Sequence, residues 1–158
     1  LARGARHIVV LHEVKDPGNV GNIMRTADAA GADAVVVTAE SVDVYNPKVV
    51  RASTGSIFHI PLVHRADLGS AIADIQAAGL VVYAADAGGR DLVSLRDEGS
   101  LAKPLAWLLG NEAHGLSAEA ESVADQVVAV PLYGQAESLS LPTAAAICLY
   151  EAAFAQRA

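Results

Sequence analysis

Three segments of the sequence collect residues that could bind a ligand or take part in catalysis. They are residues 16–22 (DPGNVGN), 110–117 (GNEAHGLS) and 131–142 (PLYGQAESLSLP). Each follows a short apolar run that is typical of a buried strand. In open α/β sheets, ligands bind beyond the carboxyl ends of parallel strands. We therefore expect the three segments to lie on one edge of a sheet and to form one pocket.

In the first segment, Asp, Asn and Gly also suit a turn and a helix N-cap, so residue types alone leave both roles open. The sequence predicts a turn at 16–19 and a helix over 20–30. Its periodicity places Arg25 nearly opposite the apolar face. An exposed arginine is compatible with plain solvation and also with a contact to a phosphate or ribose.

In the second segment, Gly110 and Gly115 allow a ligand to approach the backbone closely. Glu112 lies between them and is a candidate site carboxylate, although solvation is the commoner fate of such a residue. His114 could act as a general base, but no orienting partner is evident in the sequence. Ser117 suits the N-cap of a following helix.

The third segment leads into an Ala-rich helix over 142–155. Ser138 and Ser140 suit a helix cap, and Pro142 suits the first helical turn. Backbone amides at a helix start also bind carboxylate or phosphate groups. Cys148 lies inside the helix, which indicates a buried small apolar side chain rather than a nucleophile.

The elements that must position these segments alternate along the chain. Short apolar runs predict strands at 8–11, 34–37, 60–63, 80–83, 105–109 and 127–130. Helices are predicted at 20–30, 66–78, from about 117, and at 142–155. Strands that are apolar throughout indicate a sheet buried on both faces. The expected fold is therefore one α/β domain over residues 1–158, with a parallel sheet and helices on both faces.

Composition excludes several classes of protein. Of 158 residues, 53% are hydrophobic and 18% charged, which rules out intrinsic disorder. A single cysteine excludes a disulfide framework. No apolar run is long enough to span a bilayer and no signal-peptide pattern opens the chain, so a cytoplasmic protein is expected. Five scattered histidines lack metal-ligand spacing, so no metal site is expected.

The formal net charge of −7 argues against a stand-alone nucleic-acid binder, because such proteins gain affinity by neutralising phosphates. A catalytic domain that acts on RNA with help from another domain remains compatible with it. The sequence begins at Leu1 without an initiator methionine and enters an apolar run almost at once. We therefore expect it to be part of a longer protein. No Walker loop, Gly-x-Gly-x-x-Gly, Gly-x-Ser-x-Gly or His-Glu-x-x-His motif is present.

Taken in order, the three segments resemble the signature motifs of the SpoU-type (TrmH-like) RNA ribose 2′-O-methyltransferases of the SPOUT superfamily. Residues 16–31 resemble the first motif, with Asn19 and Arg25 six positions apart. Residues 108–116 resemble the second. Residues 130–132 and 137–140, with the helix through 150–151, resemble the third.

The resemblance implies a fold with a deep C-terminal trefoil knot, in spite of the rarity of knots. It also implies S-adenosylmethionine as the methyl donor, a homodimer with its active site near the subunit interface, and a separate N-terminal RNA-binding domain. By the same resemblance, the donor is held by backbone groups around Gly110, Val130, Leu132, Ser138 and Leu139.

The implied reaction is methyl transfer to a ribose 2′-hydroxyl, a reaction that calls for no metal. Arg25 is expected to stabilise the developing alkoxide and to hold a neighbouring phosphate, since arginine is a reluctant base. Asn19 and Glu112 would orient the arginine and the substrate, and Ser138 is the fourth residue assigned to catalysis. The sequence has Ser140 where the family usually has asparagine, which puts catalytic rate and substrate choice in question.

The sequence is therefore compatible with three functions. The leading one is methylation of ribosomal RNA, which is favoured over transfer RNA. The second is an RNA- or donor-binding module with little turnover, motivated by Ser140 and the acidic composition. The third is an unrelated α/β enzyme that uses the same edge of the sheet.

Overall fold

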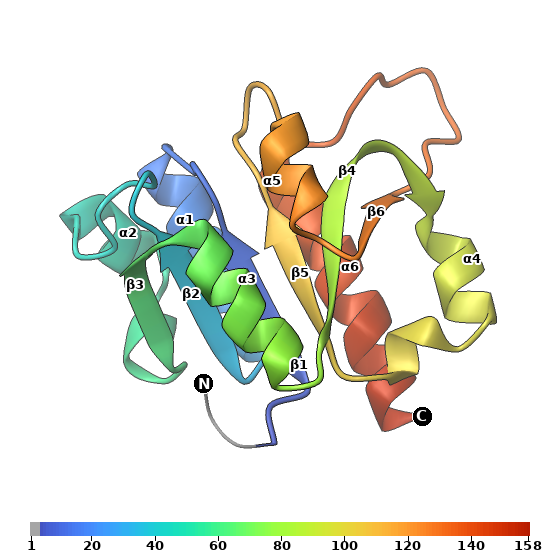
Figure 1. Cartoon of the computed structure of the whole chain (residues 1–158). Coiled ribbons are helices and arrows are strands. Elements are labelled where there is room, and N and C mark those ends of the chain that lie inside the picture. The colour runs from blue at the N-terminus through green and yellow to red at the C-terminus, as the bar shows by residue number, and fades with distance from the viewer. Residues whose placement is uncertain (1–3) are drawn as a thin grey trace.

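A six-stranded parallel sheet forms the centre of the molecule in the computed structural model, which describes residues 4–158 (Figure 1). The strand order is β3-β2-β1-β5-β4-β6, and every adjacent pair is parallel. The strands are β1 (His7–Leu11), β2 (Ala34–Thr38), β3 (Leu62–Ala66), β4 (Val81–Asp91), β5 (Leu105–Leu109) and β6 (Gln126–Ala129). Both the α/β class and the parallel sheet predicted from the sequence are confirmed.

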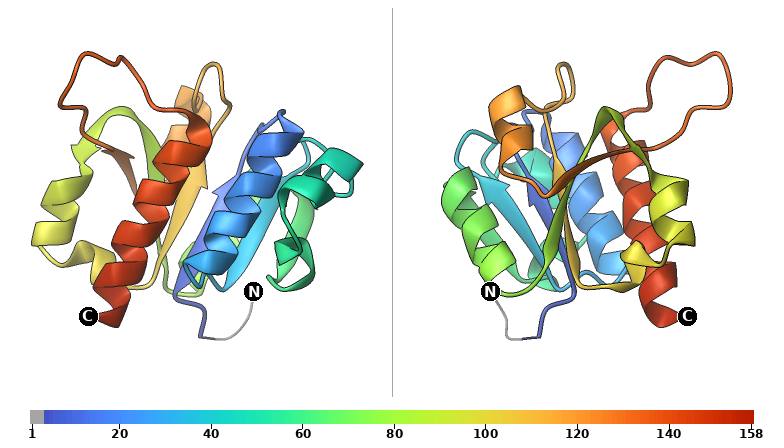
Figure 2. Two further views of the ribbon diagram at one scale, coloured as in Figure 1. Left: turned by 180° about the vertical axis from the view of Figure 1, so that it is seen from behind. Right: turned by 45° about the vertical axis from the view of Figure 1, so that its right-hand side comes forward.

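Helices cover both faces of this sheet. In Figure 2, α1 and α6 lie side by side on one face, while α3 and α5 lie on the other. The α-helices are α1 (Pro17–Ala29), α2 (Pro47–Ala52), α3 (Leu68–Ala77), α4 (Leu92–Asp97), α5 (Ala118–Ser122) and α6 (Leu141–Arg157), and the 3₁₀ helices are η1 (Ser56–Phe58) and η2 (Ser100–Ala102). No helix of residues 4–158 has the length and hydropathy needed to cross a membrane.

The alternation of side chains along the central strands explains why these runs are apolar throughout. Val9 on β1 and Trp107 on β5 belong to the core beneath α1 and α6, whereas Ile8 and Ala106 belong to the core beneath α3 and α5. Successive residues of a strand point to opposite faces, so a strand covered on both sides must be apolar at every position.

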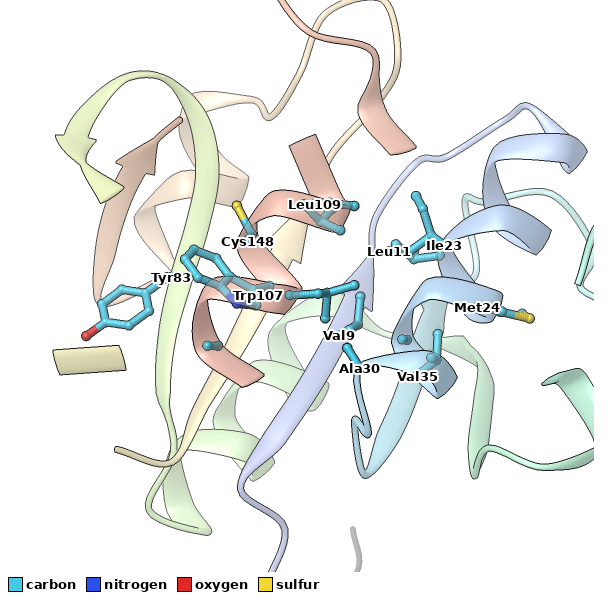
Figure 3. Close-up of a cluster of buried hydrophobic side chains, with 14 of the residues drawn as sticks. Val9, Leu11, Ile23, Met24, Ala30, Val35, Tyr83, Trp107, Leu109 and Cys148 are labelled. Atoms are coloured by element: carbon cyan, nitrogen blue, oxygen red, sulfur yellow. The ribbon is translucent and has the colours of Figure 1, made fainter. Parts of the chain in front are cut away.

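Trp107 is the largest fully buried side chain and lies at the centre of the larger core (Figure 3). Its ring centroid lies 5.5 Å from that of Tyr83, and Cys148 of α6 belongs to the same cluster. Cys148 is fully buried, as the sequence predicted.

The boundaries of several elements differ from the sequence predictions. The turn predicted at 16–19 is instead the start of α1, because the Asp16 carboxylate accepts a hydrogen bond from the Asn19 amide and Pro17 suits the first helical position. The strand predicted at 60–63 begins two residues later, at Leu62. The strand predicted at 80–83 continues to Asp91, because β4 pairs with β6 in two separate stretches.

Four short helical elements were not predicted. They are α2, η1, α4 and η2, none longer than six residues. Asn46 caps α2 and Asp91 caps α4, each through a side-chain oxygen that accepts a backbone hydrogen bond. Helices this short carry too few apolar positions to show a period of 3.6 residues.

Because all six strands are parallel, their carboxyl ends share one edge of the sheet. Three segments that leave that edge are the start of α1 after β1, residues 110–117 after β5, and residues 130–140 after β6. The shared edge predicted for the three loops is thus present in the fold.

Candidate functional site

A cavity of about 360 Å³ lies at this edge, beside the ends of β4, β5 and β6. Its walls come from the end of β4, the loop after β5, the end of β6 and the segment that leads into α6. The lining residues are Ala85, Asp86, Ala87, Leu109, Asn111, Glu112, Ala113, His114, Gly115, Val128, Ala129, Val130, Leu132, Glu137, Ser138, Leu139, Leu141 and Ala144. The volume lies within the range of small-molecule sites.

The wall that follows β5 is a tight hairpin. Asn111 and Gly115 exchange two backbone hydrogen bonds of 3.0 and 2.9 Å. The Gly115 carbonyl therefore lies against Gly110, where a Cβ atom would come within 2.6 Å of that oxygen and 2.7 Å of Leu116 Cγ. Gly110 is buried beneath the hairpin and does not itself line the cavity. Its role is to let the two ends of the hairpin meet.

Asp86 supports this hairpin from β4. Its carboxylate accepts hydrogen bonds of 2.7 Å from the backbone amides of Leu116 and Ala87. Residues 86–89 leave the pairing between β4 and β6, because the register shifts between Ala85 and Arg90. Because these residues leave the sheet here, Asp86 lies in the wall of the cavity.

Sequence reasoning missed Asp86 as a site residue. The available signal was its position: it follows the apolar run at 80–83 and precedes the Gly88-Gly89 pair. That arrangement places it at the same edge of the sheet as the other three segments.

Glu112 connects the hairpin to the start of α1. Its carboxylate accepts hydrogen bonds from the backbone amides of Asp16 (2.9 Å) and Lys15 (3.3 Å). Partial desolvation is the largest influence and raises the pKa of Glu112, but the hydrogen bonds from Asp16, Lys15 and the Asn19 side chain outweigh it, so the pKa is lowered overall. The carboxylate is thus ionised at neutral pH and holds the first and second segments together.

Asn111 makes a second connection between the same segments. Its side-chain Nδ2 donates a 2.9 Å hydrogen bond to the carbonyl of Glu13, and its Oδ1 accepts from the amides of Ala113 and His114. Glu13 adopts a positive φ of 56° at this point. The loop after β1 is therefore fixed from the hairpin by both a carboxylate and an amide.

No residue of the first segment, 16–22, lines the cavity, so the prediction that all three segments form one pocket holds only for the second and third. Asn19 and Arg25 therefore lie outside the lining. Asn19 reaches Glu112 as described, on the first turn of α1. Arg25 is exposed, as the periodicity predicted, and makes no hydrogen bond or ion pair within residues 4–158. The structure thus brings Asn19 and Glu112 together but leaves Arg25 with a free guanidinium group further along α1.

The third segment contributes Val130, Leu132, Ser138 and Leu139 to the lining, and all four were predicted to bind the donor. Residues 131–139 make no hydrogen bond within the described part of the chain, and in Figure 2 the segment arches away from the body of the molecule. Of these residues, Leu132, Glu137, Ser138 and Leu139 line the cavity, so their backbone amides and carbonyls are open to a ligand in it.

Ser140 is the N-cap residue of α6, but its side chain makes no cap hydrogen bond. Its hydroxyl instead pairs with that of Thr143 at 2.8 Å. Ser140 therefore occupies the predicted N-cap position, but its side chain does not cap the helix.

The charge of the lining restricts the ligand. Asp86, Glu112 and Glu137 are its charged residues, and no lysine or arginine of residues 4–158 lines it. A phosphate group would meet carboxylates with no compensating cation, whereas a cationic ligand would be stabilised. No group of three or more His, Cys, Asp or Glu side chains suited to a metal ion occurs in residues 4–158.

The sequence profile described as the SpoU rRNA Methylase family matches residues 6–150. Among curated proteins, the chain is 42% identical over 147 residues to the 23S rRNA (guanosine(2553)-2'-O)-methyltransferase RlmP of Bacillus subtilis (strain 168), covering 92% of this chain and 57% of the relative. It is 38% identical to the 23S rRNA (uridine(2479)-2'-O)-methyltransferase of Streptomyces viridochromogenes, covering 91% of this chain and 51% of the relative.

Solved structures show the same similarity. The SpoU methyltransferase AviRb from Streptomyces viridochromogenes, in complex with the cofactor AdoMet, has a TM-score of 0.85 and 37% identity over 97% of this chain and 61% of that chain. The AdoMet-bound rRNA methyltransferase from Sinorhizobium meliloti has a TM-score of 0.82 and 35% identity over 96% of this chain and 57% of that chain. The chain spans little more than half the length of these relatives.

Proposed function

This chain belongs to the SpoU rRNA Methylase family, and from that premise we propose that it transfers a methyl group from S-adenosylmethionine to a ribose 2′-hydroxyl of ribosomal RNA. Two relatives are named as 23S rRNA 2′-O-methyltransferases, which favours ribosomal over transfer RNA. The proposed donor is the cofactor named in two similar structures.

The observation that carries the proposal is the acidic cavity built by the second and third family motifs and the end of β4, which no lysine or arginine of residues 4–158 lines. S-adenosylmethionine has a sulfonium and an ammonium group against one carboxylate, so its net charge suits walls that contain Asp86, Glu112 and Glu137. Leu109, Val128 and other apolar lining residues offer a surface for an adenine ring. The open backbone groups of Leu132 and of residues 137–139 supply hydrogen-bonding partners for the donor.

The donor supplies a methyl group already activated on a sulfonium, so the chain has to position the acceptor hydroxyl and stabilise its charge. Arg25 is the proposed stabiliser of the developing alkoxide and of a neighbouring phosphate, because its guanidinium group is permanently charged and free of partners within residues 4–158. Asn19 and Glu112 hold the start of α1 against the hairpin and so fix where this helix points. Ser138 lies in the cavity wall with its hydroxyl available to the donor or acceptor.

A homodimer is part of the proposal. Exposed Tyr150 and Phe154 on α6 flank a shallow hollow of about 290 Å³ that also involves Ala29 and Ala30 at the end of α1. Aromatic side chains in such a setting are typical of interfaces. Light scattering that gives twice the chain mass, and the chain mass alone for Phe154→Glu, would support this face as the interface.

Three further expectations from the resemblance stay proposals. The deep trefoil knot is supported by the strand order, in which the chain leaves β5 inside the sheet, forms β6 at its edge and returns through α6 across β5. A cytoplasmic location fits an enzyme that acts on ribosomal RNA. A separate N-terminal RNA-binding domain would belong to the longer protein.

The test is transfer of labelled methyl from S-adenosylmethionine to total RNA under single-turnover conditions, alongside calorimetric binding of S-adenosylhomocysteine. Binding with transfer supports the enzyme. Binding without transfer by the full-length protein favours the alternative of a module with little turnover, which Ser140 motivates. Failure to bind would contradict the proposed donor. The family membership already argues against an unrelated α/β enzyme.

A further inference from the structure

One part of this acidic chain contains no acidic residue. Between residues 44 and 66 there is no Asp or Glu, although the whole chain has 18 of them and a net charge of −7. The same stretch contains three Lys or Arg residues and two histidines, which are Lys48, Arg51, His59, His64 and Arg65. Cations without neighbouring carboxylates in the same stretch give a locally positive potential, which attracts anionic partners.

The stretch folds as one surface. It forms α2, η1 and the edge strand β3, which lie together at one side of the molecule (Figure 1). All five basic side chains are exposed. We call residues 44–66 the basic edge.

The lysine and arginine side chains of the basic edge are not neutralised by the fold. Lys48, Arg51 and Arg65 form no ion pair with a carboxylate of residues 4–158. The nearby carboxylates have other partners. Asp43 accepts from the Tyr45 amide at 2.9 Å, and Asp28 of α1 accepts from Ser56 and His59 of the basic edge at 2.7 and 3.3 Å.

Exposed aromatic rings are interleaved with these cations. Tyr45 is 60% exposed and Phe58 is 80% exposed. The Tyr45 ring meets His64 edge-on with centroids 5.1 Å apart, which leaves a ring face open to solvent. Aromatic faces beside cations suit unstacked bases and their phosphates.

The basic edge is continuous with the helix that carries Arg25. Gly21 of α1 packs so closely on α2 that a Cβ atom there would lie 2.6 Å from the Val49 carbonyl. Asp28, two turns further along α1, bonds to Ser56 as described. Arg25 lies between these two positions on the same stripe of the helix, since residues i, i+4 and i+7 share a face. The exposed Arg25 is therefore on the part of α1 that meets the basic edge.

We propose that the basic edge docks a single-stranded segment of the RNA substrate, with Lys48 and Arg65 on its phosphates and Phe58 stacked on a base. This inference rests on the proposed function and adds the place on the surface where the RNA segment binds. The net charge of the chain concealed this surface, because ten excess negative charges outside residues 44–66 outweigh three positive charges within them.

The test is the salt dependence of binding to a fluorescein-labelled 20-nucleotide single-stranded RNA of mixed sequence, measured by anisotropy. For Lys48→Gln/Arg65→Gln, the slope of log Kd against log salt should become shallower by about 1.4, or about 0.7 for each phosphate that is no longer neutralised. Lys103→Gln is the matched control, since Lys103 is exposed just before β5, outside the basic edge, and should leave the slope within error.

Phe58→Ala tests the stacking contact. It should weaken binding of the same RNA about fivefold or more without changing the slope. An unchanged slope in the double variant, or an equal change of slope in Lys103→Gln, would overturn the proposal. A change in mass by light scattering for Phe58→Ala, with RNA binding unaltered, would instead identify a protein interface.

Failure of the basic edge can be told apart from failure of the proposed function. Binding of S-adenosylhomocysteine reports on the cavity and should be the same in Lys48→Gln/Arg65→Gln as in the unaltered chain. If RNA binding depends on the basic edge while no RNA accepts a methyl group, the docking surface stands and the enzymatic proposal fails.

Discussion

Glu112 and Arg25 differ in what the fold requires of them. The Glu112 carboxylate already accepts two backbone hydrogen bonds that hold the start of α1, so its removal would disturb the arrangement of the site as well as any chemistry. Arg25 has no partner within residues 4–158, so its substitution can isolate a functional role.

Arg25→Ala should therefore abolish methyl transfer while the affinity for S-adenosylhomocysteine stays nearly unchanged. Stability should change by no more than about 0.5 kcal/mol, as for other exposed substitutions. Arg25→Lys is the matched control: it keeps the charge but loses the planar fork, so partial activity is expected. Full activity in the alanine variant, measured with labelled donor, would remove Arg25 from the mechanism.

His7 makes the stability of the protein depend on pH. It is 1% exposed and neither ring nitrogen has a hydrogen-bond partner within residues 4–158. Burial lowers the pKa of His7 from 6.5 to about 4, with Asp33 opposing the shift and Arg157 adding to it. Between these two values the unfolded chain binds a proton that the folded chain does not.

The free energy of unfolding should therefore fall by about 3 kcal/mol from His7 alone as the pH drops from 7 to 4. Urea unfolding of His7→Leu should show a shallower dependence on pH than the unaltered chain. The control is His114→Leu, which replaces an exposed imidazole and should retain the full dependence. If the free energy of unfolding depended equally on pH in His7→Leu and in the unaltered chain, His7 would not be the source of the pH dependence.

At the scale of elements, the hairpin at 111–115 depends on the missing side chain of Gly110. Gly110→Ala should force Gly115 away, at a cost of about 1–3 kcal/mol in unfolding free energy, and should weaken S-adenosylhomocysteine binding. Gly134→Ala is the control in a neighbouring loop, because a Cβ atom there meets nothing within 4 Å. Calorimetric titrations of both variants that gave the same affinity would contradict this role for the hairpin.

The sequence predicted the elements whose signal is local. Buried strands such as β1, β2 and β5 appear as unbroken apolar runs, and α6 as a long Ala-rich stretch that begins at a proline. The three loops were placed at one edge because parallel strands require it. The residues of the donor site were named from the family resemblance, and most of them line the cavity, although their roles stay predictions.

What the sequence could not show depends on pairing between distant segments. The position of Asp86 after an apolar run indicates the edge of the sheet, but Asp86 reaches the cavity because β4 and β6 change register around 86–89, and no local pattern predicts that register shift. The Glu112 contacts with Lys15 and Asp16 join residues almost a hundred positions apart. The edge strand β3 was misplaced because its exposed polar residues carry no apolar signal.

At the scale of the whole molecule, the reactivity of Cys148 shows whether α6 opens separately from the rest of the fold. It lies fully buried between α6 and the sheet, and burial raises the pKa of its thiol to about 12. We expect no reaction with a disulfide reagent under native conditions and one equivalent of reaction after denaturation with guanidinium chloride. Rapid native labelling, with the circular dichroism spectrum unchanged, would show that α6 opens independently of the rest.

The whole molecule also separates charge in a way that suits its proposed task. The acidic cavity is suited to a cationic donor, whereas the basic edge is suited to the phosphates of the acceptor, and α1 lies between them with Arg25 exposed. Donor and acceptor would therefore be attracted to different regions of one surface.

The most direct measurement is where a transferred methyl group is found. Ribosomal RNA incubated with the protein and isotopically labelled S-adenosylmethionine would be digested to nucleosides and analysed by mass spectrometry. The account predicts label on the ribose of one nucleoside, at its 2′-oxygen, and none with Arg25→Ala. Label on a base, or no label with RNA that the protein binds, would contradict it.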